Sequence, residues 1–95
     1  MIAKSMNARL RITITEYQHE LILEHVSLYI LNSEIEEEIS SAIPKNGKCH
    51  IYLSEDDLED LIGSCCFVVN HEEKNKNLIL ELDDLIDYLE GVLND

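Results

Sequence analysis

The sequence is poor in basic residues. Its 95 residues include seven Lys and Arg against 20 Asp and Glu, which gives a formal net charge of −13. Because phosphate binding needs clustered Lys and Arg, this composition argues against nucleic acid as a direct partner. The charge is compatible with a partner that has a basic protein surface, and equally with a purely solubilising role.

Long apolar runs are also missing. No stretch reaches the roughly 18 apolar residues that a membrane-spanning helix needs, so we expect no membrane partner. Residues 1–7 lack the apolar run of a signal peptide. We therefore expect a cytoplasmic location.

Glycine and cysteine are scarce too. None of the three glycines stands in a Gly-x-Gly arrangement, so there is no glycine-rich phosphate loop, and we expect no cofactor. The three cysteines are an odd number with Cys65 and Cys66 adjacent, which is a poor disulfide framework and favours a reducing compartment. We expect Cys65 to be buried and Cys66 to be partly exposed. Neither is expected to be catalytic, because the local sequence is acidic.

The length predicts a single small domain over residues 1–95, with residues 1–8 as a loosely ordered tail. A chain this short buries a modest core, so dimerisation is a plausible source of extra stability.

The first half begins with a strand and a capped helix. Leu10, Ile12 and Ile14 alternate with polar residues, which is the pattern of a half-buried strand. Thr15 and Gln18 then form a capping-box sequence, so a helix should start at about Glu16. Residues 26–31 are rich in aromatic and branched side chains; we prefer a helix there, with a strand as the alternative.

A short helix and a loop follow. Ser33 and Glu36 match a second capping box, and Ile35, Ile39 and Ile43 form an apolar stripe at four-residue steps. Residues 44–47 (Pro-Lys-Asn-Gly) end this helix and are the clearest loop and the best candidate for a hinge at the midpoint of the chain.

The second half repeats the start of the first. Residues 49–53 alternate as a strand, and Ser54 with Asp57 should cap a helix. Gly63 lies within that helix and suggests a close contact with another backbone. Residues 70–77 are polar and turn-like. The last helix carries a broad apolar stripe: Leu78, Leu82, Leu85, Ile86, Leu89 and Leu93.

The predicted fold class is therefore α+β and mainly helical, with two short strands packed against about four helices. The order is strand–helix–helix, then strand–helix–helix. Ile12 and Ile51 occupy equivalent places, 39 residues apart, so a pseudo-repeat is possible. The outer sheet face, with Arg9, Arg11, Lys48 and His50, should be mildly basic on an acidic body.

Metal chemistry has little support. His19 and His25 are six residues apart and lie about 120° apart around a helix, which does not match the i, i+4 spacing of a zinc-binding helix. The acidic run at residues 55–60 lacks the order of an EF-hand loop. We predict no metal site and no catalytic residue.

The last helix carries the clearest interaction signal. Leu82, Leu85 and Leu89 lie close to a seven-residue repeat and are candidate residues of a homodimer interface, with Tyr88 at its rim. The alternative is that the whole stripe packs on the domain's own core.

Residues 53–93 carry a recognisable pattern. It runs Leu53-Ser54-x-x-x-Leu58-x-x-Leu61-Ile62-Gly63, then Asn70-His71, a turn with Lys74, and Leu82-Asp83-x-Leu85-x-x-x-Leu89. This half resembles small uncharacterised bacterial proteins with a helix–Asn-His–helix pattern, a resemblance that implies no activity. It implies that Asn70, His71 and Lys74 form a polar site between two helices. The alternative is that Asn70 and His71 cap the helix end.

The leading functional prediction is a non-enzymatic module for protein–protein interaction or regulation, forming a homodimer. The alternative is an acidic inhibitor, antitoxin-like or anti-defence, that masks a basic nucleic-acid-binding site on another protein. A third possibility is a weak metal-binding or enzymatic role centred on His71.

Overall fold

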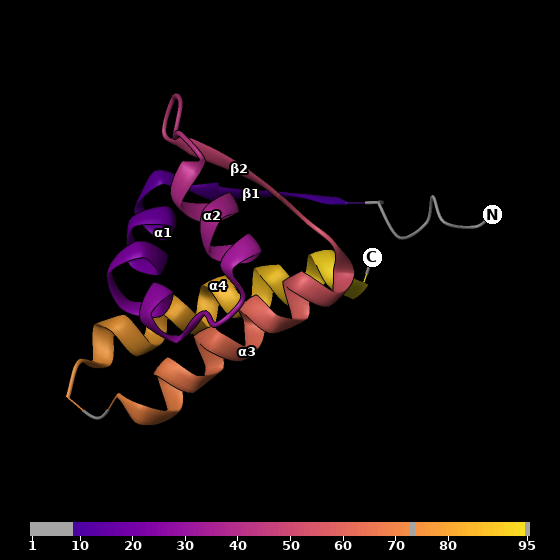
Figure 1. The fold of residues 1–95 in the computed structure, drawn as a ribbon. Coiled ribbons are helices and arrows are strands. Elements are labelled where there is room, and N and C mark those ends of the chain that lie inside the picture. Colours follow the sequence, from indigo (N-terminus) through magenta and orange to yellow (C-terminus); the bar gives the residue numbers. More distant parts are fainter. Residues whose placement is uncertain (1–8, 73, 95) are drawn as a thin grey trace.

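Strands and helices follow one another in the predicted order (Figure 1). The computed structural model describes residues 9–72 and 74–94, so the predicted tail at residues 1–8 lies outside the described residues. Its elements are β1 (Leu10–Thr15), α1 (Glu16–Leu21), the π-helical turn η2 (Ile22–Val26), the 3-10 turn η3 (Ser27–Tyr29), α2 (Ser33–Ser41), β2 (Lys48–Leu53), α3 (Glu55–His71) and α4 (Lys76–Asn94). The predicted α+β, mainly helical fold is confirmed.

The two strands form an antiparallel sheet in which Ile12 lies opposite Ile51. These two residues are the ones that the sequence places at equivalent positions of its halves. The inner face buries Ile12, Ile14, Cys49, Ile51 and Leu53. The halves diverge after their helix caps, because α1 has six residues whereas α3 has 17.

Side chains from the helices cover both edges of the sheet. On β1, the Thr13 amide donates to the Tyr88 hydroxyl at 2.9 Å. On β2, the Tyr52 amide donates to a Glu38 carboxylate oxygen, also at 2.9 Å. These contacts satisfy backbone donors that an unprotected edge strand would offer to another chain. Tyr88 therefore protects a strand edge, a role that the sequence did not predict.

Two of the three predicted helix caps are confirmed. The Thr15–Gln18 capping box forms in both directions at α1, and the Ser54 hydroxyl accepts from the Asp57 amide at α3. The predicted Ser33–Glu36 box at α2 is wrong by one residue: Asn32 is the N-cap, and its side chain accepts from the Glu34 amide at 2.8 Å. Asn is at least as good a cap as Ser, so the earlier residue prevails.

Helix α2 also ends earlier than its apolar stripe implied. Ile35 and Ile39 are buried, but Ile43 lies beyond Ser41 and is exposed. The predicted loop at residues 44–47 is a tight hairpin turn, with Asn46 and Gly47 at positive φ of 57° and 79°. Two backbone hydrogen bonds between Lys45 and Lys48 close this turn, which lies at the top of Figure 1. The segment predicted as a hinge is therefore a hydrogen-bonded turn.

Residues 22–30 leave the regular α-helix. Ile22, Val26 and Ile30 are buried at four-residue steps. The π-helical turn η2 is wider than 3.6 residues per turn, so the four-residue step from Ile22 to Val26 stays on one side. Residues 26–31 thus contain helical turns as far as Tyr29, without the strand that was the alternative, and Ile30 is extended.

The core lies between the sheet and the antiparallel pair α3–α4, which runs along the bottom of Figure 1. Its buried residues from α3 and α4 are Leu58, Leu61, Ile62, Cys65, Val68, Leu78, Leu82, Leu85, Ile86 and Leu89. The predicted close backbone contact at Gly63 is wrong, because nothing lies within 4 Å of the place where a Cβ would be.

Candidate protein-docking groove

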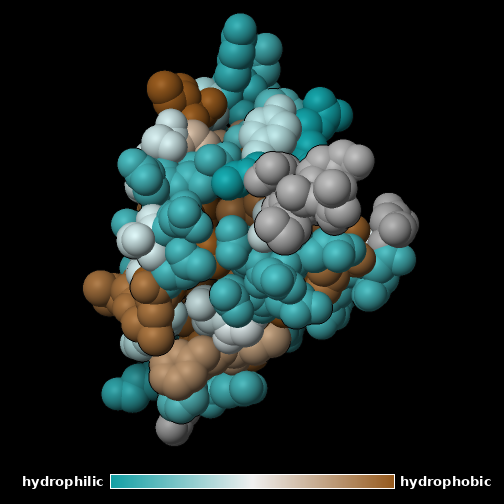
Figure 2. All heavy atoms as spheres, turned by 45° about the vertical axis from the view of Figure 1, so that its right-hand side comes forward, coloured by the Kyte–Doolittle hydropathy of each residue, from teal (hydrophilic) through white to brown (hydrophobic). Residues whose placement is uncertain are grey.

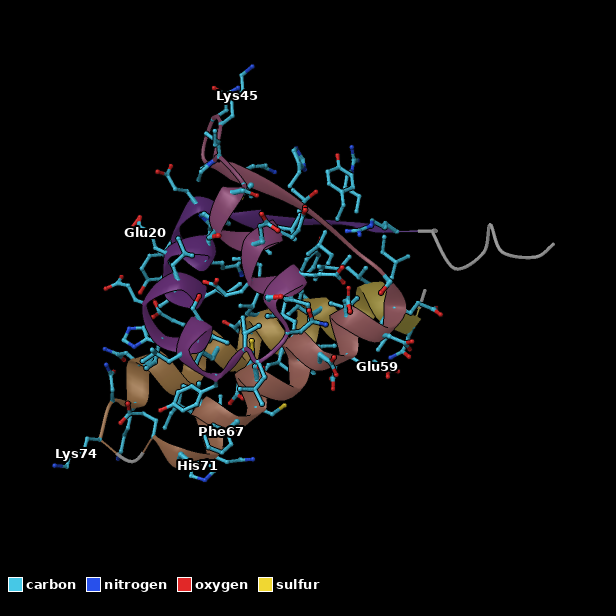
Figure 3. All side chains as sticks on the ribbon, in the orientation of Figure 1. Glu20, Lys45, Glu59, Phe67, His71 and Lys74 are labelled. Carbon is cyan, nitrogen blue, oxygen red and sulfur yellow. The ribbon has the colours of Figure 1, made fainter. Side chains whose placement is uncertain are left out.

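The structure does not bring the predicted polar residues Asn70, His71 and Lys74 into one site. Asn70 and His71 belong to the last turn of α3, and both are exposed. The His71 ring stacks on Phe67 at a centroid distance of 3.9 Å, and its Nδ1–H donates to the Phe67 carbonyl at 2.8 Å. In Figure 3 the Lys74 side chain points out from the turn, away from His71. His71 thus bonds a carbonyl of the last turns of α3, which agrees with the His71 part of the capping alternative.

The predicted interface residues of the last helix lie inside the molecule. Leu82, Leu85 and Leu89 are each 0% exposed within a single copy of the chain. The apolar stripe packs on the domain's own core, as the alternative interpretation had it. A dimer could reach these three side chains only by opening that core.

An open groove of about 760 Å³ lies between α3 and the segment that joins η3 to α2. The sequence did not predict it. Its lining residues are Leu28, Tyr29, Ile30, Leu31, Asn32, Ile35, Glu59, Asp60, Gly63, Ser64 and Phe67.

The walls of this groove are unusually apolar for exposed surface. Leu28 and Leu31 are 83% and 95% exposed, and the aromatic rings of Tyr29 and Phe67 are about half exposed. Figure 2 shows brown and tan side chains gathered on this side of the molecule, at the lower left, among hydrophilic neighbours. A contiguous apolar surface rimmed by polar residues is typical of an interaction site.

Contacts across the groove hold its two walls together. The Tyr29 and Phe67 rings lie 4.8 Å apart between centroids. The Ser64 hydroxyl lies 3.2 Å from the Tyr29 carbonyl and the same distance from the Asp60 carbonyl, so it can donate to either. At the floor, Ile30 and Ile35 are buried. The groove is therefore preformed in the free chain.

One end of the groove is acidic. Glu59 and Asp60 are exposed and belong to its lining, and Glu59 lies two helical turns before Phe67 on α3. Figure 3 shows Glu59 and Phe67 along the same helix. The chain's charge of −13 adds a long-range negative field around this end.

The buried His19 and the three cysteines lie outside the lining of the groove. The buried His19 donates from Nε2 to the Ile39 carbonyl at 2.8 Å, at the C-terminal end of α2. Burial raises the pKa of the Cys65 thiol to about 12, and the neighbouring Cys66 adds to the shift. Burial also raises the pKa of Cys49 and of the half-buried Cys66. These shifts oppose the thiolate formation that nucleophilic catalysis needs.

Within residues 9–72 and 74–94, no three His, Cys, Asp or Glu side chains are placed to hold a metal ion together. None of the helices in this part of the chain is both long and apolar enough to cross a membrane. Comparison with protein-family models, curated proteins and solved structures finds no match to the chain.

A signal for the groove was present in the sequence. Leu28 and Leu31 fall outside the stripe formed by Ile22, Val26 and Ile30, so a helix or turn that buries the stripe must expose them. That they line one groove together with Phe67 could not be predicted from the sequence, because it depends on how η3 packs against α3.

Proposed function

We propose that the protein is a non-enzymatic protein-interaction module that binds its partner through the groove between α3 and residues 28–35. The exposure of Leu28 and Leu31 beside a preformed aromatic pair carries this proposal. Apolar side chains gathered beside an aromatic pair and rimmed by polar residues are a feature of interaction sites.

The partner is a basic surface of another protein. Glu59 and Asp60 border the groove, and the whole chain carries a charge of −13. A second copy would bring the same charge to the same place, so the groove is better suited to a different protein than to a homodimer. Cytoplasmic location remains part of the proposal, supported by the free thiols of Cys49, Cys65 and Cys66.

The acidic-inhibitor function is a special case of the same proposal, in which the partner's basic surface is a nucleic-acid-binding site. The acidic residues of α2, Glu34 and Glu36–Glu38, favour it, because they add to the negative charge of the helix that follows the groove segment. In that case, DNA or RNA would compete with this protein for the captured partner.

Affinity capture from a lysate of the source cells tests the proposal when groove variants are included. The wild-type chain should retain a specific protein that is released at high salt. The double variant Leu28→Ser/Leu31→Ser should lose it. The control Ile43→Ser, which changes a side chain 85% exposed and outside the groove, should retain it. Equal capture by all three proteins would refute the groove as the docking surface.

A further inference from the structure

We propose that the groove's occupant is an amphipathic basic helix of the partner protein, with apolar anchors at i, i+3 or i+4, and i+7, and Lys or Arg at the end that meets Glu59. This inference rests on the proposed function and names the partner's recognition element. It follows from the groove's shape, from the backbone groups at its walls and from its charge.

The shape favours an elongated occupant along α3. Glu59, Gly63 and Phe67 follow at four-residue steps and line one side of the groove. At 1.5 Å per residue this side is about 12 Å long, or a little over two helical turns. Three anchors at i, i+4 and i+7 on a partner helix span a matching length.

Gly63 gives the groove its room. No atom lies within 4 Å of the place where its Cβ would be, and the residue has no positive φ that would require glycine. A glycine at an exposed position inside a helix costs stability relative to other residues. Because Gly63 has no side chain, the surface of α3 is flat between the acidic end and Phe67. An apolar anchor of the partner can approach the helix backbone there.

Backbone groups at the groove and at the sheet make an added strand a poor occupant. The Tyr29 carbonyl lies within reach of the Ser64 hydroxyl, and the Ile30 amide donates to the Ser27 carbonyl. At the sheet, Tyr88 and Glu38 already accept from edge amides. Strand addition depends on a row of free backbone groups, whereas a helix needs only side-chain pockets.

The charge of the groove sets the polarity of the occupant. Glu59 and Asp60 lie at one end, and Phe67 with Leu28 forms the apolar part. A partner helix therefore carries Lys or Arg at one end of its apolar stripe. The same charge disfavours a second copy of this chain as the occupant, because its acids would meet Glu59 and Asp60.

The test uses a defined probe, a fluorescein-labelled peptide of about 15–18 residues built from Leu and Lys, with Leu at i, i+3, i+4 and i+7 so that it forms a basic amphipathic helix. A scrambled peptide of the same composition removes the apolar face and keeps the charge. Fluorescence anisotropy gives the Kd of each peptide for the full-length chain and its variants.

The decisive variant is Gly63→Leu, with Gly91→Leu on α4 as the matched control. Both glycines have open space where a Cβ would be, and Leu is a good helix former, so both variants should fold and show a Tm no lower than wild type. Gly63→Leu should weaken peptide binding by about tenfold or more, because the new side chain fills the groove. Gly91→Leu should bind within about twofold of wild type, and the scrambled peptide should bind about tenfold more weakly.

Three results would overturn the inference. Equal binding to wild type and Gly63→Leu would place the peptide elsewhere on the acidic surface. Equal binding of the scrambled peptide would mean that charge alone is recognised. Light scattering that finds a wild-type dimer dissociated by Gly63→Leu would make a second copy the occupant. If the inference fails in any of these ways while Leu28→Ser/Leu31→Ser still abolishes capture from lysate, the groove remains the docking surface and only the helical occupant is wrong.

Discussion

The rings of Tyr29 and Phe67 meet at a centroid distance of 4.8 Å and an interplanar angle of 47°. Tyr29 ends the 3-10 turn η3, and Phe67 lies in the last turns of α3. Their contact joins two segments that are distant in the sequence into the walls of one groove. Phe67 also stacks on His71, which lies outside the groove lining, so the ring that closes the groove wall is held from both sides.

Ser64→Ala should loosen the groove. The Ser64 hydroxyl is in hydrogen-bond reach of the Tyr29 carbonyl, and its removal leaves that carbonyl to solvent. We expect a loss of about 0.5–1 kcal/mol in the free energy of unfolding, since the site is exposed. Amide exchange in residues 28–32 should become faster, as measured by hydrogen–deuterium exchange. Ser41→Ala, at the exposed end of α2, is the control and should leave exchange in that segment unchanged.

Thr15→Ala and Ser54→Ala should each lower the free energy of unfolding by about 1 kcal/mol. The two hydroxyls accept hydrogen bonds from the amides of Gln18 and Asp57, which have no partner within their helices. Urea unfolding followed by circular dichroism measures the change. Ser40→Ala, in the last turn of α2, removes only a 3.4 Å hydrogen bond to the Glu37 carbonyl and should cost less. A cap variant no less stable than Ser40→Ala would show that the cap contributes nothing.

His19→Leu should destabilise the chain by about 1–2 kcal/mol despite adding an apolar side chain to the core. The Ile39 carbonyl loses the Nε2–H donor and keeps only its 3.3 Å contact with the Ala42 amide. Thermal and urea unfolding provide the measurement. His25→Leu changes a half-buried histidine in the same helical segment and should have a smaller effect; the opposite ranking would contradict the capping role of His19.

The hydroxyl of Tyr17 should titrate above its ordinary pKa of 10.0. It donates to a Glu81 carboxylate oxygen at 2.6 Å, and this hydrogen bond is the largest cause of the raised pKa, followed by desolvation and by the charges of Glu81, Glu24 and Glu20. The stabilising effect is therefore complete below pH 10 and is lost as the pH rises through the raised pKa. Tyrosinate absorbance should show a late titration step that disappears in Tyr17→Phe and moves to lower pH in Glu81→Gln. A late step that persists in Tyr17→Phe would assign it to another tyrosine.

Alkylation should discriminate among the three cysteines. Cys49 and Cys65 are 0% exposed, and burial raises the pKa of both thiols. Cys66 is half-buried, and although burial and the charges of Glu90 and Asp83 raise its pKa too, it is accessible to reagent. In the native chain at mildly alkaline pH, iodoacetamide should therefore label Cys66 first, with all three labelled after denaturation. Mass spectrometry of the labelled peptides gives the order, and rapid labelling of Cys65 in the native chain would contradict its burial.

Much of the fold could be predicted from the sequence, because strands and helix starts follow from the alternation and capping of neighbouring residues. The alternation at Ile12 and Ile51 predicts strands, and Thr15 and Ser54 predict the helix starts that follow. At α2 the same rules were off by one residue, since Asn32 and Ser33 are both good caps and only the backbone angles distinguish them.

The candidate site was not accessible in this way. The sequence assigned interaction to Leu82, Leu85 and Leu89, because a broad apolar stripe looks the same whether it faces a partner or the domain's own core. It assigned a polar site to Asn70, His71 and Lys74, whereas the structure places Asn70 and His71 in the last turn of α3, with the His71 ring on Phe67.

By itself, the sequence determined the order of strands and helices, the acidic charge and the reduced state expected of the cysteines, since these follow from periodicity, capping and composition. Only the tertiary structure decided which apolar residues remain exposed. Leu28 and Leu31 line a groove because η3 packs against α3 through Tyr29, Phe67 and Ser64, contacts between residues far apart in the chain that no local pattern encodes.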